Sequence, residues 1–192
     1  MKQSTSVRGI TALAVCALAW VVLASASTAR AGTLTVTTLS DSGPGSLRQA
    51  IADANPGDAI TFSAKGTITL TSGALVIFQD VTIKGPGPNK LQISGNHTDR
   101  VFVIASGRVA LAGIAIRDGR ADGNSPIMPS TGGGILNLAS LTLANVVLFD
   151  NQALGDPSQS PLGLPGLGQG GGVANFGILA ASDSAFLRNL AL

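Results

Sequence analysis

Two stretches of the chain repeat each other without a gap: GGGILNLASLTLANVVLFDNQA at residues 132–153 and GGGVANFGILAASDSAFLRNLA at residues 170–191. Seven of the 22 aligned positions are identical, and three of these are glycines. In both copies apolar residues alternate with small or polar ones, which is typical of half-buried β-strands. The repeat therefore predicts that the chain stacks similar β-units on one another.

Earlier segments fit the same frame. Residues 109–121 align with residues 141–153, and residues 75–85 form a fainter copy. A leucine-rich repeat would need the spacing L-x-x-L-x-L-x-x-N, which these segments lack, and they contain no helical pattern. We therefore expect an all-β fold, a parallel β-helix (solenoid) of about five or six coils that share one aliphatic core.

Two pairs of asparagines recur in the repeat. Asn137 aligns with Asn175, and Asn151 aligns with Asn189. Their amides can stack as a ladder in which each coil bonds the next. Alternatively they are ordinary turn formers, because asparagine tolerates the backbone conformation of tight turns. Both roles are structural, and the sequence favours neither.

One segment has a helical pattern instead. In SLRQAIADA at residues 46–54, Leu47, Ala50, Ile51 and Ala54 share one helical face. Ser46 and Gln49 have the spacing of a capping box, and a Gly-Pro-Gly sequence precedes them. We expect one short amphipathic helix here, so that residues 32–62 form an N-terminal strand and a capping helix and residues 63–192 form the coils.

Residues 1–31 have the layout of a secretory signal peptide. Lys2 and Arg8 precede an apolar run at residues 10–24, and Ala29-Arg30-Ala31 is an A-x-A cleavage site. Cleavage before Gly32 would also remove Cys16, the only cysteine of the chain. We therefore expect export by a Sec-type pathway to the extracellular space, the cell surface or the outer membrane.

Removing the signal peptide changes the charge of the chain. The formal net charge is +2, but residues 1–31 hold three of the twelve basic residues and none of the ten acidic ones, so the remainder carries −1. A nucleic-acid partner is therefore not expected. The remainder has no cysteine for a disulfide scaffold and no apolar stretch long enough to span a membrane.

Three further motifs resemble a known group of proteins. They are DSGPGSLRQAI followed by NPGDAITF at residues 41–62, IKGPG with LQISGN at residues 83–96, and the GGG-I/V-x-N starts of the two copies. Together they resemble the N-terminal region of bacterial secreted right-handed parallel β-helix proteins of the pectin-lyase-like superfamily, which include polymorphic-outer-membrane-protein-like and adhesin-like surface proteins. In many relatives the helix motif reads Cys-Ser-Leu-Arg-Glu-Ala, where this chain has Gly45-Ser46-Leu47-Arg48-Gln49-Ala50.

The resemblance implies that the helix caps the N-terminal end of the coils. It also implies that relatives continue through further coils, so we expect this chain to be a fragment that is truncated inside a coil. An apolar coil end and an unpaired strand edge would then be exposed, and poor solubility of the isolated chain is the expected consequence. A monodisperse monomer in light scattering at high concentration would contradict it.

Few residues are candidates for chemistry. His97 is the only histidine, and a catalytic role would pair it with Asp99 and a nearby arginine. Residues so close along a strand or turn seldom converge, and no serine-centred nucleophile motif accompanies them. We therefore interpret His97 as a solvated turn residue.

The acidic loops offer a weak alternative. Asp118, Asp122 and Asn124 lie in the loop 117–130, where oxygen ligands could bind Ca²⁺ weakly. The spacing matches neither an EF-hand nor a nonapeptide calcium repeat, so a polar loop is the preferred interpretation. The same holds for Asp150 and Asp156. The segment 166–171 matches G-x-G-x-x-G but lacks a strand-then-helix context, so we interpret 155–172 as a loop inserted between two coils.

The function hypothesis follows from these observations. The segment after residue 31 contains none of the motifs Asn-Thr-Asp, Asp-Asp, Gly-His-Gly or Arg-Ile-Lys and no Trp or Tyr, and its six Phe residues are expected in the core. We expect a non-enzymatic, adhesin-like scaffold with no catalytic residue, cofactor or metal, whose partner is left open between glycans and proteins of a host or cell surface. The alternative is an N-terminal fragment of a carbohydrate-active β-helix enzyme, a lyase or hydrolase, whose site lies beyond Leu192.

Overall fold

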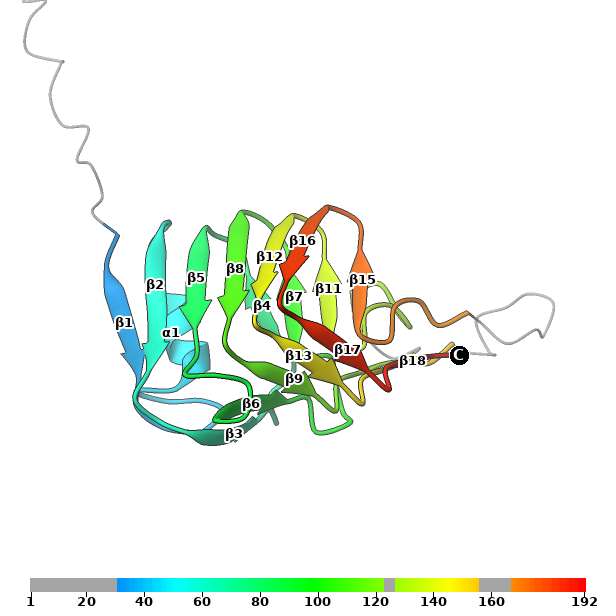
Figure 1. The fold of residues 1–192 in the computed structure, drawn as a ribbon, viewed down its shortest axis with the longest axis horizontal. Helices are drawn as coiled ribbons and strands as arrows, with labels where there is room; N and C mark the ends of the chain where they lie inside the picture. Colours follow the sequence, from blue (N-terminus) through cyan, green and yellow to red (C-terminus); the bar gives the residue numbers. More distant parts are fainter. Residues whose placement is uncertain (1–30, 123–126, 156–166) are drawn as a thin grey trace, which may run out of the picture. The chain divides into compact units, whose positions relative to one another are not determined.

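The structure is a computed structural model that describes residues 31–122, 127–155 and 167–192, and these belong to one compact unit. The described residues form four parallel β-sheets and one α-helix (Figure 1). This architecture is all-β and compatible with a parallel β-helix. The expected signal peptide at residues 1–31 lies almost entirely outside the described residues.

The strands of each sheet come from distant parts of the chain. Sheet A has the order β1 (Thr33–Val36), β2 (Asp58–Phe62), β5 (Val81–Lys84), β8 (Arg108–Ala112), β12 (Ser140–Ala144) and β16 (Ile178–Ser182). Sheet B has the order β3 (Gly66–Thr69), β6 (Leu91–Ser94), β9 (Ala115–Arg117), β13 (Val147–Phe149) and β17 (Ala185–Leu187). Sheet C consists of β4 (Leu75–Ile77), β7 (Phe102–Ile104), β11 (Ile135–Asn137) and β15 (Val173–Asn175), and sheet D of β10 (Arg120–Ala121), β14 (Gln152–Ala153) and β18 (Leu190–Ala191).

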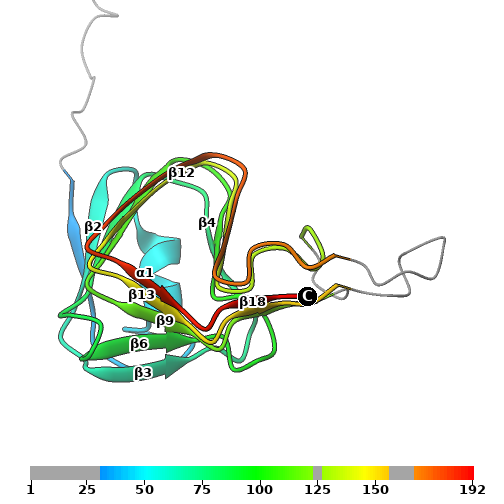
Figure 2. The ribbon, with the colours of Figure 1, turned by 45° about the vertical axis from the view of Figure 1, so that its right-hand side comes forward.

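The chain visits the sheets in a fixed order. It passes from sheet A to sheet B, then through sheet D in the later part, then to sheet C and back to sheet A. We call one such passage a circuit, and in Figure 2 successive circuits lie behind one another. Every strand pairs with the equivalent strand of the next circuit in parallel, so each sheet grows by one strand per circuit.

The register predicted from the repeat is confirmed. Leu141 pairs with Leu179, and Leu148 pairs with Phe186. The earlier copy is also in register, because Val109 pairs with Leu141. The 38-residue distance between the two glycine triplets is one circuit, since Ile135 pairs with Val173. The extra length falls between β14 and β15, where residues 156–166 are outside the described part of the chain.

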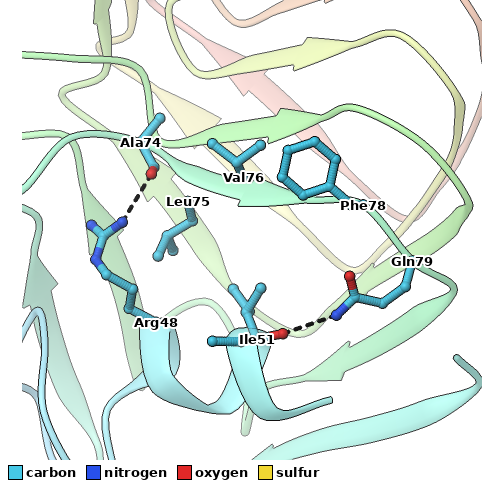
Figure 3. A pocket seen from close by; sticks show the side chains of 8 residues that line it. Arg48, Ile51, Ala74, Leu75, Val76, Phe78 and Gln79 are labelled. Atoms are coloured by element: carbon cyan, nitrogen blue, oxygen red, sulfur yellow. Dashed lines mark hydrogen bonds between the residues drawn. The ribbon is translucent and has the colours of Figure 1, made fainter. Parts of the chain in front are cut away.

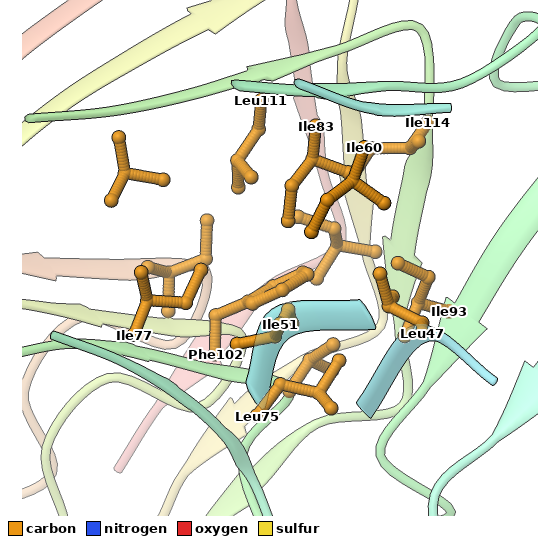
Figure 4. Close-up of a cluster of buried hydrophobic side chains, with 14 of the residues drawn as sticks. Leu47, Ile51, Ile60, Leu75, Ile77, Ile83, Ile93, Phe102, Leu111 and Ile114 are labelled. Atoms are coloured by element: carbon orange, nitrogen blue, oxygen red, sulfur yellow. The ribbon is translucent and has the colours of Figure 1, made fainter. Parts of the chain in front are cut away.

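One aliphatic core runs through the circuits. Alternate strand residues point inward and are buried, as shown by Ile60, Ile83, Leu111 and Leu143, which follow one another in register in sheet A. Figure 4 shows side chains of these strands meeting Leu75, Ile77 and the ring of Phe102 from the opposite sheet. Burying each such side chain stabilises the fold by about 1.5–3 kcal/mol, so stacking of the circuits is the main source of stability.

The predicted helix is present as α1 (Leu47–Asp53). The Ser46 side chain accepts a hydrogen bond from the backbone N–H of Gln49, so Ser46 is the N-cap. Leu47, Ala50 and Ile51 are buried, and α1 packs against β1 and β4. The helix therefore covers the core beside the first circuit, as Figure 4 shows for Leu47 and Ile51. Within the described residues no helix is long and apolar enough to cross a membrane.

A partly buried ion pair joins this cap to the loop before β4. Arg48 Nη2 lies 2.7 Å from Asp41 Oδ1, and the same guanidinium donates hydrogen bonds to the carbonyl oxygens of Gly73 and Ala74. Asp41 Oδ2 also accepts hydrogen bonds from the backbone N–H groups of Thr71 and Ser72. Burial opposes ionisation, but the hydrogen bonds from Ser72, Arg48 and Thr71 hold the pKa of Asp41 well below its usual value.

This pKa shift predicts loss of stability in acid. The folded protein binds a proton at Asp41 less readily than the unfolded chain, whose aspartate pKa is about 3.9. The contribution of Asp41 is therefore complete above about pH 4 and is lost as the pH falls further. We expect Asp41→Asn to cost about 2 kcal/mol at pH 7 and to flatten the loss of stability below pH 4.

Urea unfolding at pH 7, 5, 4 and 3 tests this expectation. The matched control is Asp53→Asn, because Asp53 is exposed at the end of α1. If Asp41→Asn and Asp53→Asn lose the same small amount of stability at pH 7 and keep the same slope in acid, Asp41 does not stabilise the cap.

The expectation that the six phenylalanines lie in the core is wrong for four of them, because Phe149 lines a surface groove and three others are exposed. Phe102 is fully buried, but Phe78, Phe176 and Phe186 are 67%, 53% and 47% exposed. Phe78 and Phe176 each follow an inward-facing position and lie on the outer side of sheet C. Phe186 occupies the position of the buried Leu148, but β17 is the last described strand of its sheet.

Candidate functional site

A column of charged side chains follows the strands of sheet B. Asp118, Asp150 and Arg188 come directly after β9, β13 and β17, and all three have a left-handed backbone, with φ of 51°, 55° and 50°. Aspartate is one of the residues that tolerate this conformation in turns. The turn geometry therefore places the three charged side chains at equivalent points of successive circuits.

Asp118 receives hydrogen bonds from several directions. Arg117 Nε donates to Asp118 Oδ2 at 2.5 Å, and Ser94 Oγ lies 3.1 Å from the same oxygen. His97 Nε2 lies 3.6 Å from Asp118 Oδ1, and the His97 backbone N–H donates to the Asp118 carbonyl oxygen. Sequence reasoning missed this pairing because Asp118 belongs to the next circuit.

The catalytic pairing of His97 with Asp99 does not occur. Asp99 accepts hydrogen bonds from the backbone N–H groups of Arg100 and Ala74, and its carboxylate therefore shapes the turn. The His97 side chain is 59% exposed and lies at a left-handed turn position, with φ of 56°. The interpretation of His97 as a solvated turn residue fits this geometry.

Asp150 and Arg188 form an ion pair between circuits. Arg188 Nε and Nη2 donate to the two carboxylate oxygens of Asp150, both at 2.8 Å. The hydrogen bond from Arg188 lowers the pKa of Asp150, and the same bond raises the pKa of Arg188. Because the Arg188 side chain is 69% exposed, water screens this pair and it contributes little stability.

A shallow groove lies beside this charged column on the outer side of sheet B. Its volume is about 260 Å³, and it is lined by Pro88, Asn89, Gln92, Ala115, Val147, Phe149, Leu187 and Arg188. The guanidinium carbons of Arg117 and Arg188 lie 5.5 and 6.0 Å from the centre of the Phe149 ring. Both arginines also contact an aspartate, so the groove offers an aromatic surface with hydrogen-bonding groups but little net charge.

The acidic loop residues are not gathered into a metal site in the described residues. Arg120 Nε donates to Asp122 Oδ2 at 3.2 Å, while Asp118 and Asp150 bind arginines. Asn124 and Asp156 lie outside the part of the chain that the structure describes. Within that part, no group of three or more His, Cys, Asp or Glu side chains could hold a metal ion.

Arg100 has a structural environment. It is 1% exposed, and its guanidinium donates to the backbone carbonyl oxygens of Met128, Thr131 and Gly132. Burial lowers the pKa of Arg100, while the charges of Asp99 and Asp122 oppose this effect. The arginine that a catalytic interpretation placed beside His97 thus binds the segment that leads into β11.

A second surface lies on the outer side of sheet C. We call it the apolar face, and it consists of two columns in register: Val76, Val103, Leu136 and Ala174, and then Phe78, Ala105, Leu138 and Phe176. Backbone hydrogen bonds extend the register to the second column, because the N–H groups of Ala105, Leu138 and Phe176 donate to the carbonyl oxygens of Ile77, Ile104 and Asn137. Val103 and Leu136 are at most 1% exposed, whereas Phe78, Leu138 and Phe176 are 37% to 67% exposed.

A pocket of about 360 Å³ adjoins the apolar face at its N-terminal end. It is lined by Arg48, Ile51, Ala52, Ala74, Leu75, Val76, Phe78 and Gln79, from α1 and the region of β4 (Figure 3). At the edge of the pocket, Gln79 Nε2 donates a hydrogen bond to the carbonyl oxygen of Ile51 in α1. This polar group therefore binds the helix. The pocket and the apolar face together offer an apolar docking surface.

Sequence reasoning missed the apolar face. The signal was present, because Leu75 and Ile77 point into the core and period two then places Val76 and Phe78 outside. A strand that is apolar on both sides reads as fully buried, and nothing in one sequence shows what covers its outer side. Comparison with known protein families, with curated proteins and with solved structures found no match to this chain.

Proposed function

We propose that this chain is an exported, non-enzymatic scaffold: a right-handed parallel β-helix that is secreted or displayed on a cell surface, adhesin-like. One observation carries the proposal. Polar side chains that could serve chemistry instead join one circuit to the next, as Asn137 does with Asn175, Asn151 with Asn189 and Arg188 with Asp150. Such contacts keep sheet faces and loops at fixed positions.

The parallel pairing in all four sheets supports the β-helix. The core is continuous through the circuits, and α1 covers it at the N-terminal side. The motifs at residues 41–62 and 83–96 support the assignment to the pectin-lyase-like surface proteins that they resemble. The signal-peptide pattern at residues 1–31 supports export.

Export is tested by expressing the full 192-residue chain in a bacterial host. We expect the protein recovered outside the cytoplasm to begin at Gly32, because small residues at positions 29 and 31 form the cleavage site. Ala31→Leu should block cleavage, whereas Lys65→Leu, outside the signal peptide, should leave it unchanged. Recovery of the unprocessed chain in the cytoplasm would contradict the proposal.

A carbohydrate-active enzyme whose site is the groove beside Phe149, rather than a site beyond Leu192, is the second candidate. An aromatic ring edged by amide and guanidinium groups can contact a sugar through its face and its polar rim. A panel of acidic polysaccharides with Ca²⁺ separates the two candidates. The scaffold proposal expects no release of reducing or unsaturated ends, and turnover that is lost in Phe149→Ala would overturn it.

A further inference from the structure

We propose that the apolar face of sheet C binds the apolar face of a second copy of this chain, with the two sheets related by a twofold axis and their strand orders running in opposite directions. The inference goes beyond the scaffold function, and the two can fail separately.

The apolar face differs from the outer surfaces of the other sheets. The outer side of sheet A carries Thr35, Thr61, Thr82 and Thr142, and Thr35 and Thr61 are hydrogen-bonded. The outer side of sheet B carries the charged column and, beside it, the groove with the Phe149 ring, whose edge holds amide and guanidinium groups. The columns of sheet C contain only Val, Leu, Ala and Phe. In the second column Phe78, Leu138 and Phe176 are exposed, and an exposed apolar patch of this kind marks an interaction surface.

The apolar face is complementary in shape to the same face of a second copy. Its second column runs Phe78, Ala105, Leu138 and Phe176 from β4 to β15. When a second copy is laid over it in the opposite order, each Phe78 meets Phe176, and each Leu138 meets the small Ala105. In the first column Val103, Leu136 and Ala174 are already buried, so the second column makes the contact. A copy laid in the same order would instead place Leu138 on Leu138 and leave a gap at Ala105.

The apolar face carries no charge. None of the eight residues is ionisable, so a second copy brings no like charges into the contact. Arg48, the nearest cation of the adjoining pocket, is bound to Asp41 and to the carbonyl oxygens of Gly73 and Ala74. The face therefore lacks the charged groups that a partner binding through ionic contacts would need. A second copy of the face binds through apolar contacts and does not need such groups.

The exposed apolar area of the face sets the expected strength of the association. A phenylalanine contributes about 150–250 Å² when buried, so the exposed parts of Phe78, Leu138 and Phe176 amount to roughly 300 Å² per copy. Two copies hide roughly 600–700 Å², which is below the ~1,200 Å² of a standard stable interface. We therefore expect a weak, reversible dimer with a Kd between ~10 µM and ~1 mM.

Sedimentation at rising concentration, on protein recovered from export of the full chain, measures this association. Phe78→Asp should abolish it, and circular dichroism should show that this exposed substitution leaves the fold intact. Phe186→Asp is the matched control, because Phe186 is similarly exposed on β17, away from sheet C. Association that is lost in Phe186→Asp but kept in Phe78→Asp would place the contact at the last circuit and overturn the proposal, as would a monomer at millimolar concentration.

The twofold arrangement has two tests of its own. Ala105→Leu should weaken the dimer by crowding Leu138, and the double variant Ala105→Leu/Leu138→Ala should restore it; a stronger dimer for the single variant would contradict the pairing.

In a Cys16→Ser background, a mixture of Phe78→Cys and Phe176→Cys chains should form a mixed disulfide on mild oxidation, while neither variant alone should do so. Cross-linking within each single variant, or none in the mixture, would overturn the arrangement.

Discussion

Replacing Asn151 with alanine is expected to lower the free energy of unfolding by about 3–5 kcal/mol. The side chain is fully buried, and it joins three circuits. Asn151 Nδ2 donates to the carbonyl oxygen of Ile116 in the preceding circuit and to Asn189 Oδ1 in the following one, and Oδ1 accepts from the N–H of Gly119. Alanine would leave at least two buried backbone groups without a partner, at about 1–3 kcal/mol each.

Urea unfolding of the variant measures this loss. Asn89→Ala is the matched control, because Asn89 is exposed, and its loss should stay within about 0.5 kcal/mol. Asn189→Ala should lie between the two, since Asn189 is only partly buried and belongs to the last described circuit. If Asn151→Ala costs no more than Asn89→Ala, the asparagine contacts do not hold the circuits together.

The same contacts decide between the two roles that the sequence left open for the asparagines. Asn137 Nδ2 donates to Asn175 Oδ1 at 2.5 Å, and Asn151 Nδ2 donates to Asn189 Oδ1 at 2.8 Å, which confirms the ladder. None of these four residues has a positive φ, so the left-handed turn geometry is met by other residues. One sequence could not show this, because an amide in a turn and an amide in a ladder produce the same pattern.

The repeat predicted the stacking of the strands well. A shift of one residue would turn every inward side chain outward, so the alternation around Leu141 and Leu143 determines the register strongly. The helix at residues 46–54 was predictable for a similar reason, since its cap and its apolar face agree with each other. Local patterns that agree with one another are the part of the fold that sequence reasoning recovers.

The candidate sites were less predictable, because they depend on contacts between circuits. His97 and Asp118 are 21 residues apart in sequence, and only the β6–β9 pairing brings their turns together. The apolar face was not predicted, for a related reason. Val103 and Phe102 lie on opposite sides of one sheet, but a strand that is apolar on both sides is typical of full burial, so both are expected in one core.

The glycine triplets follow from how closely the circuits approach. Gly132 has φ of +72°, a conformation that favours glycine, and the equivalent Gly170 has φ of +65°. Gly133 needs glycine for another reason. A Cβ added there would lie 2.2 Å from the carbonyl oxygen of Gln152 and 2.6 Å from its backbone nitrogen. Gln152 belongs to β14 of the next circuit, so Gly133 is where the chain passes close beside sheet D.

Gly133→Ala is therefore expected to cost about 3 kcal/mol or more. The clashing atoms are backbone atoms of a strand that is paired on both sides with β10 and β18, so they cannot rotate away as a side chain would. Relief requires β14 to move, and that movement would disturb the Asn151 hydrogen bonds next to it. Urea unfolding measures the loss, and a fall in soluble yield is the expected outcome if the variant does not fold.

Gly172→Ala is the matched control for this prediction. Gly172 is the third glycine of the second triplet, and its added Cβ would approach only the side chain of Asn189, at 3.1 Å, without a positive φ. A side chain can yield by a few tenths of an ångström, so we expect a loss below about 1 kcal/mol. Gly171→Ala repeats the backbone clash, at 2.2 Å from the Leu190 carbonyl oxygen, but β18 is paired on one side only and can shift more easily. The expected order of damage is thus Gly133, then Gly171, then Gly172, and any other order would mean that close backbone approach is not what requires the glycines.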